Sequence, residues 1–128
     1  MAKLVIALMA ALTMSAAATA QSSLWKTEEG QNGGYAVVEI HDCVQDASLK
    51  CGTIQQIIGN ENQDPIGQPI IIDMQEQEPN NWAGGKIWAP DEDKWYDAKM
   101  ELKGDVLEVA GCVLAGLICR GQSWTPHE

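Results

Sequence analysis

Few side chains in this sequence are of the types that carry out catalysis. The only histidines are His41 and His127, and no second histidine stands at the spacing of a metal-ligand pair. No Gly-x-Ser-x-Gly motif or glycine-rich phosphate loop occurs. Asp91, Glu92 and Asp93 resemble part of a calcium loop, but its glycine and distal glutamate are missing, so we favour a solvated turn. We therefore expect a protein that is not an enzyme and uses no metal ion or cofactor.

The four cysteines fall into two close pairs, Cys43 with Cys51 and Cys112 with Cys119. Neither spacing is the C-x2-C of a zinc knuckle or a thioredoxin-like redox site. Four cysteines allow three connectivities. We favour Cys43–Cys51 and Cys112–Cys119, because each pair encloses a stretch that can turn back on itself. A loop of this length stabilises by about 2–3 kcal/mol in the chain-entropy model.

The first twenty residues have the pattern of a secretory signal peptide. Lys3 supplies a positive charge, residues 4–12 are uninterruptedly apolar, and Ala18-Thr19-Ala20 is a small-x-small cleavage site. The apolar run is too short to span a bilayer, which needs roughly 20 residues. We expect cleavage after Ala20, export to the periplasm or beyond, and one mature domain from residue 21 to residue 128. Disulfides are stable in such a compartment.

The composition restricts the possible partners. The chain has 128 residues, a formal net charge of −10 and a pI near 4.4, and loss of Lys3 with the signal peptide makes the mature chain more negative still. An acidic protein of this kind is a poor match for nucleic acid or for anionic lipid. We expect a small molecule or an envelope protein as partner, no nucleic acid, and no membrane insertion after signal removal.

The mature chain reads as about eight short strands separated by turn residues, which is typical of an antiparallel barrel or sandwich. The clearest strand is 95–102, where Tyr96, Ala98, Met100 and Leu102 alternate with charged residues. Lys103-Gly104-Asp105 then predicts a tight turn into 106–109. Residues 60–69 and 75–84 fit strands poorly, and 77–81 has the composition of a surface loop. The wall of any cavity is predicted to consist of Trp88, Tyr96, Ala98, Met100, Leu102, Leu107 and Val109.

Five tryptophans and no phenylalanine make an unusual aromatic content. The tryptophans could line an apolar ligand pocket. The interpretation we prefer is that most of them simply fill the interior of a small barrel. Trp95 falls on the polar face of its strand, so we expect it at the rim or on the surface.

Several segments, taken in order, resemble one bacterial exported family, DUF2147 (domain of unknown function 2147). The C-R-x-Q-x-W-T ending is the most specific of them. The resemblance runs from Leu24 to Thr125 and is carried by Leu24-Trp25-Lys26-Thr27-Glu28, Cys51-Gly52-Thr53-Ile54, Gly84-Gly85-Lys86-Ile87-Trp88, Tyr96–Gly104 and Cys119-Arg120-Gly121-Gln122-Ser123-Trp124-Thr125.

The resemblance implies a small up-and-down β-barrel similar to the calycins, the group that includes the lipocalins. It supplies no catalytic residues, because no activity is established for the family. By analogy with calycins, Trp25 on the first strand would pack beneath Arg120 on the last strand, a contact of roughly 0.5–2 kcal/mol. We therefore expect Trp25, Arg120 and Trp124 to be structural.

Two functions are compatible with these expectations. The first is a periplasmic calycin-like module that binds a small, partly apolar molecule. The alternative is an envelope protein-interaction or structural factor whose barrel is filled and holds no ligand. The two differ in one property, which is whether the barrel interior contains a cavity.

Overall fold

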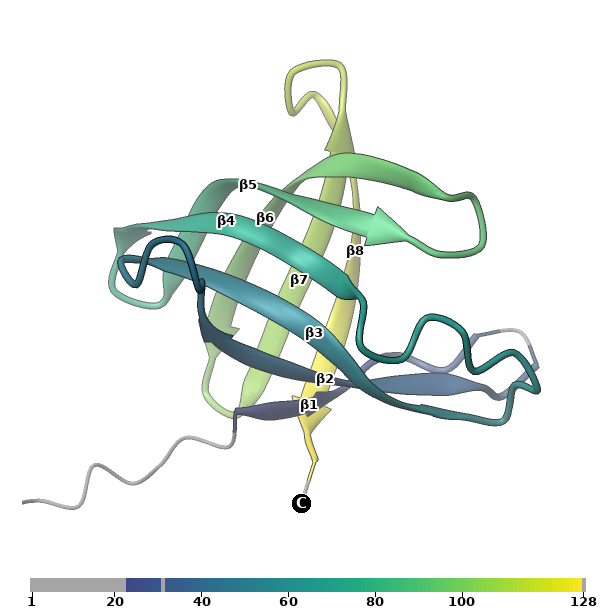
Figure 1. Ribbon diagram of the computed structural model, residues 1–128. Helices are drawn as coiled ribbons and strands as arrows, with labels where there is room; N and C mark the ends of the chain where they lie inside the picture. Colours follow the sequence, from purple (N-terminus) through teal and green to yellow (C-terminus); the bar gives the residue numbers. More distant parts are fainter. Residues whose placement is uncertain (1–22, 31, 128) are drawn as a thin grey trace, which may run out of the picture.

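The computed structural model describes residues 23–30 and 32–127, so the predicted cleavage site at Ala20 lies outside the described residues. Eight antiparallel strands form a closed barrel in which each strand pairs with the next and β1 pairs with β8 (Figure 1). This arrangement confirms the predicted all-β, up-and-down barrel. The strands are β1 (Leu24–Lys26), β2 (Tyr35–Asp42), β3 (Leu49–Ile58), β4 (Pro69–Glu78), β5 (Asn81–Ala89), β6 (Lys94–Lys103), β7 (Val106–Val113) and β8 (Ile118–Pro126).

The barrel is closed unevenly around its circumference. β7 and β8 pair along most of their length, from Leu107 opposite Trp124 to Val113 opposite Ile118. The three-residue β1, in contrast, pairs with β8 only at Trp25↔Pro126 and Lys26↔Thr125. We call this short contact the seam. Within the described residues, the rest of β8 has no strand partner on its β1 side.

The interior is filled at one end of the barrel and hollow at the other. On β7 the side chains that belong to the core cluster are Leu107 and Val109, whereas Gly111 and Val113 lie toward the open end. On β8 the same division separates the buried Trp124 from the exposed Ile118. The core cluster contains Trp25, Val38, Ile54, Ile70, Ile71, Met74, Ala98, Met100, Leu107, Val109 and Trp124.

The two segments that fit strands poorly in the sequence have different structures, and one of them lies next to a close contact between β4 and β5. The predicted surface loop at 77–81 is wrong, because β4 continues to Glu78 and β5 begins at Asn81, leaving Pro79 and Asn80 as a tight turn. A Cβ atom on Gly85 of β5 would lie 2.1 Å from the Ile72 carbonyl oxygen of β4. Only glycine permits strands to approach so closely. Residues 59–68, in contrast, form no strand.

Both predicted disulfide pairings are present in the structure. Cys43–Cys51 closes the loop between β2 and β3, and Cys112–Cys119 joins directly opposed residues of β7 and β8. In the part of the chain that the structure describes, no helix is long and apolar enough to cross a membrane.

Candidate functional site: the open end of the barrel

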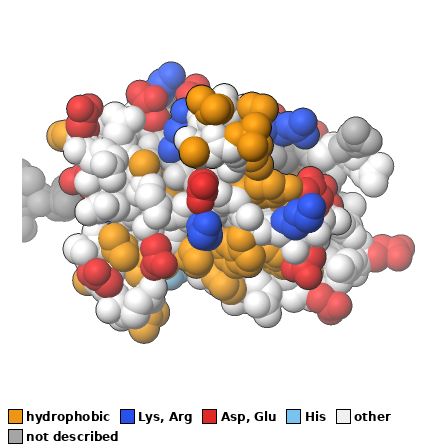
Figure 2. Space-filling model, turned by 90° about the horizontal axis from the view of Figure 1, so that it is seen from above, with side chains coloured by type: hydrophobic (Ala, Val, Ile, Leu, Met, Phe, Trp, Pro, Cys, Tyr) orange, Lys and Arg blue, Asp and Glu red, His pale blue; other side chains and the backbone are white. Residues whose placement is uncertain are grey.

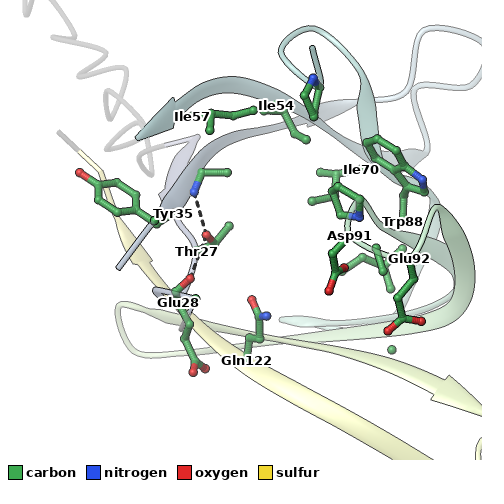
Figure 3. Close-up of a pocket in the computed structure, with 18 of the residues that line it drawn as sticks. Thr27, Glu28, Tyr35, Ile54, Ile57, Ile70, Trp88, Asp91, Glu92 and Gln122 are labelled. Atoms are coloured by element: carbon green, nitrogen blue, oxygen red, sulfur yellow. Dashed lines mark hydrogen bonds between the residues drawn. The ribbon is translucent and has the colours of Figure 1, made fainter. Parts of the chain in front are cut away.

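A cavity of about 1250 Å³ occupies the hollow end of the barrel. Its lining comes from the seven strands β2 to β8 and from loops at this end of the barrel. Figure 3 shows the labelled side chains arranged around this open space, with Ile54, Ile57 and Ile70 on one side and Glu28 and Gln122 on another. The cavity is therefore bounded partly by strands and partly by the loops at this end of the barrel.

The inner wall of the cavity is apolar. Ile54 and Ile70 are buried, while Ile57, Ile87 and Trp88 are half-buried and pack against the core cluster. Between Ile54 and Ile57 both Gln55 and Gln56 are exposed, because the β2–β3 pairing shifts register at this point, where Val38 pairs with Ile54 and Val37 with Gln56. Such a wall suits the apolar part of a ligand.

β8 contributes every second side chain to the cavity. Ile118, Arg120, Gln122 and Trp124 line it, and Cys119 between them faces outward in its disulfide with Cys112. The indole Nε1 of Trp124 donates a hydrogen bond to Gln122 Oε1 at 3.0 Å, which orients the amide. Among the described residues, no ion pair or hydrogen bond involves the Arg120 side chain. Its guanidinium group can therefore contact a bound molecule.

The mouth of the cavity is acidic. Glu28, Glu61, Asp91 and Glu92 lie around it, and Arg120 is the one basic side chain among the described lining residues. Glu28 also accepts a hydrogen bond from the Ser123 backbone N–H at 2.5 Å. This bond satisfies a β8 donor beyond the point where β1 ends.

Two aromatic residues connect the acidic mouth to the apolar wall. The Tyr96 hydroxyl donates a hydrogen bond to Glu92 Oε2. This bond, with smaller effects from desolvation and the nearby carboxylates, raises the pKa of Tyr96 above its usual 10.0, although Arg120 opposes the shift. Trp88 donates from Nε1 to Asp93 Oδ1 at 3.0 Å and stacks on Trp95 with ring centroids 6.4 Å apart. Trp95 itself is 41% exposed, in agreement with its predicted surface position.

The structure separates the predicted cavity wall into two groups. Trp88, Tyr96 and Val109 do line the cavity. Ala98, Met100, Leu102 and Leu107 instead belong to the filled end of the barrel or pack against it. Met100 also borders a second, smaller hollow of about 640 Å³. Sequence reasoning missed Gln122 and Ile118. Both lie an even number of residues from Arg120 and Trp124, so the two-residue period of a strand places them on the same face of β8.

The expected stacking of Arg120 on Trp25 is not what the structure shows. Trp25 is paired with Pro126, six residues further along β8 than Arg120. At about 3.3 Å per residue, the two positions are roughly 20 Å apart along β8. Trp25 is buried in the core cluster, whereas Arg120 is exposed on the cavity wall. The cation over an aromatic ring at this side of the barrel is Lys26, whose Nζ lies 4.3 Å from the Tyr35 ring centroid.

Among the described residues, one cluster brings three potential metal ligands together, formed by Cys43, Cys51 and Asp73. The two sulfur atoms of this cluster are bonded to each other. A disulfide has no thiolate to donate to a metal ion. Of the three groups, only the exposed Asp73 carboxylate can act as a ligand.

The fold is similar to that of a solved lipocalin-family structure. The structure of protein HP1028 from Helicobacter pylori, described as belonging to the lipocalin family, superimposes with a TM-score of 0.67. The two chains are 13% identical, and the match covers 84% of this chain and 83% of that one. At this identity the likeness establishes the fold.

The chain belongs to DUF2147, a family described as an uncharacterized protein conserved in bacteria. The family model matches residues 23–126, which is nearly the whole of the described region. No curated protein matches the chain. The predicted family is therefore confirmed. The match also includes residues 59–81, which lie between the segments that carry the resemblance.

Proposed function

We propose that this protein is a periplasmic binding module, not an enzyme, that holds one small, partly apolar molecule in the open end of its barrel. The observation that carries the proposal is the cavity of about 1250 Å³ with an apolar wall and a polar mouth. Pockets for small ligands have volumes of about 300–1,000 Å³ and combine apolar walls with a few polar groups. The cavity, whose volume includes its mouth, has enough room for such a molecule.

The polar groups of the cavity are placed to orient a ligand. Arg120 and Gln122 lie on β8, and Tyr96 lies on β6, two strands away, with Glu92 as its hydrogen-bond partner. Ile54, Ile57 and Ile70 lie deeper and would contact the apolar part. The predicted signal peptide and the two disulfides support a location in an oxidising compartment.

The alternative function, an interaction factor with a filled barrel, has less support. It requires side chains to occupy the interior from end to end, as in barrels that have no ligand site. In this chain the large buried side chains, such as Trp124, Ile71 and Met74, are concentrated at one end. The empty volume at the other end favours the binding module.

Binding can be tested with N-phenyl-1-naphthylamine, an uncharged probe that fluoresces strongly in apolar surroundings. We expect saturable binding with one site per chain. Ile57→Glu places a charge on the apolar wall and should weaken binding at least tenfold, because burying an unpaired charge is costly. Ile58→Glu is the matched control, since Ile58 is the next residue of β3, is exposed and does not line the cavity.

Two results would count against the binding module. One is an absence of saturable probe binding by the folded wild-type protein. The other is equal weakening by Ile57→Glu and Ile58→Glu. If Ile57→Glu does not fold, as judged by circular dichroism, the uncharged Ile57→Gln serves at the same position. Native mass spectrometry of the protein purified from the periplasm then shows whether a molecule remains bound.

A further inference from the structure

The hairpin between β7 and β8 ends in an exposed apolar segment, Val113–Ile118, which we call the apolar tip. Its large side chains are 40% exposed at Val113, 65% at Leu114, 84% at Leu117 and 58% at Ile118. No charged side chain occurs between Glu108 and Arg120. The hairpin projects from the top of the barrel in Figure 1. Figure 2 looks down on this end, where hydrophobic side chains gather between charged ones.

The backbone of the apolar tip gives no local reason for these residues. Leu114, Ala115 and Gly116 have φ values of 54°, 55° and 88°. Glycine, asparagine and aspartate are the residues that favour this left-handed region in hairpin turns, and a bulky side chain is strained there. Leu114 is neither a good turn residue nor packed against the core. A role outside the barrel accounts for an apolar side chain at such a position.

The shape of the apolar tip indicates what covers it. The Cys112–Cys119 disulfide ties the two strands together at its base. Three residues beyond that disulfide reach at most about 10 Å. Apolar groups of interfacial proteins penetrate about 5–10 Å into a bilayer, which is the same depth. Leu114 and Leu117 lie in the turn itself while Val113 and Ile118 end the strands, so the tip is apolar all round, which suits lipid better than a one-sided groove.

We propose that the apolar tip inserts into the interface of a zwitterionic lipid bilayer. The formal net charge of −10 opposes binding to anionic lipid, so we still expect no binding to anionic membranes. The proposal departs from the expectation of no membrane insertion. That expectation rested on the overall composition, whereas the segment between Glu108 and Arg120 contains no charged side chain. Val113 and Ile118 also line the cavity, so insertion would bring its open end close to the lipid. The proposal does not depend on the cavity being occupied.

The test is sedimentation of the disulfide-bonded protein with phosphatidylcholine vesicles. Wild type should bind, and Leu114→Ser with Leu117→Ser should lower the partition coefficient by about tenfold for each leucine removed. The matched control is Val44→Ser with Ile66→Ser, which removes exposed apolar side chains, 96% and 40% accessible, from other loops. The control should bind as wild type does. Added phosphatidylglycerol should weaken binding.

Three results would overturn the proposal. The first is wild-type protein that stays in the supernatant with phosphatidylcholine vesicles. The second is equal binding by wild type and the double leucine variant. The third is concentration-dependent self-association without vesicle binding, abolished by the leucine substitutions, which would assign the apolar tip to a second copy of the chain. Unchanged near-ultraviolet circular dichroism verifies that each variant is folded.

Discussion

Gly85→Ala should be among the most destabilising single substitutions in the barrel. The added methyl carbon would lie 2.1 Å from the Ile72 carbonyl oxygen, 2.6 Å from the Met74 sulfur and 2.8 Å from the Asp73 carbonyl carbon. Two of these three atoms belong to the β4 backbone, which cannot move aside as a flexible side chain can. Met74 is fully buried, so its sulfur has little room to retreat.

The magnitude follows from the number and kind of these contacts. Overpacking in a core costs typically 1–3 kcal/mol, and a clash with backbone belongs at the upper limit, about 3 kcal/mol. For a domain of about 100 residues, each kcal/mol lowers Tm by roughly 4–8 °C, so we expect a loss of about 12–24 °C. The reduced freedom of the unfolded chain opposes this by only about 0.4–1 kcal/mol.

The assay is thermal and urea unfolding followed by circular dichroism, with both disulfides intact. Gly121→Ala is the matched control, because its nearest neighbours, the Val109 carbonyl oxygen and the Ala110 Cβ, lie at ordinary distances of 3.8 and 3.9 Å. The control should equal wild type or exceed it slightly. A Gly85→Ala protein within 1 kcal/mol of wild type would refute the reasoning, since β4 and β5 would then have separated at little cost.

Three further predictions concern the mouth of the cavity, the part of β8 beyond the seam, and the disulfide at the base of the apolar tip. Glu92→Gln removes the main cause of the raised Tyr96 pKa, so the phenolate absorbance midpoint should fall; an unchanged titration curve contradicts the Tyr96–Glu92 bond. Glu28→Ala should speed hydrogen exchange at the Ser123 amide, measured by NMR, with distant β3 amides as the internal control. Cys112→Ser with Cys119→Ser should cost about 2–3 kcal/mol in urea unfolding, and full retention of stability would contradict the loop-entropy argument.

Sequence periodicity predicted those strands in which one face is buried. In β6 the alternation of Tyr96, Ala98 and Met100 with charged residues defines the core side. The end of β4 could not be recognised in this way, because Met74 is its last buried residue and both faces of Gln75–Glu78 are exposed. These residues are in a strand because they pair with β5, and the sequence of β4 alone does not indicate that pairing.

The division of the interior into core and cavity was not predictable from one strand alone. Tyr96 and Met100 lie on the same face of β6, yet only Tyr96 lines the cavity. The difference arises on the adjacent strand β7, where Val109 pairs with Met100, whereas Gly111, which lies beside Tyr96, has no side chain to fill the space. The separation of Arg120 from Trp25 likewise could not be predicted from either strand alone, because it depends on the pairing of Trp25 with Pro126.

The seam also has a consequence for the order of folding. Seven of the eight strand pairings join neighbours along the chain, so each can form as a local hairpin. The eighth joins opposite ends of the domain and must overcome the entropy of closing almost the entire chain into a ring. The strand pairs gained in that step are limited to Trp25↔Pro126 and Lys26↔Thr125. We therefore expect ring closure to come last during folding, and to reverse first during transient opening of the native barrel.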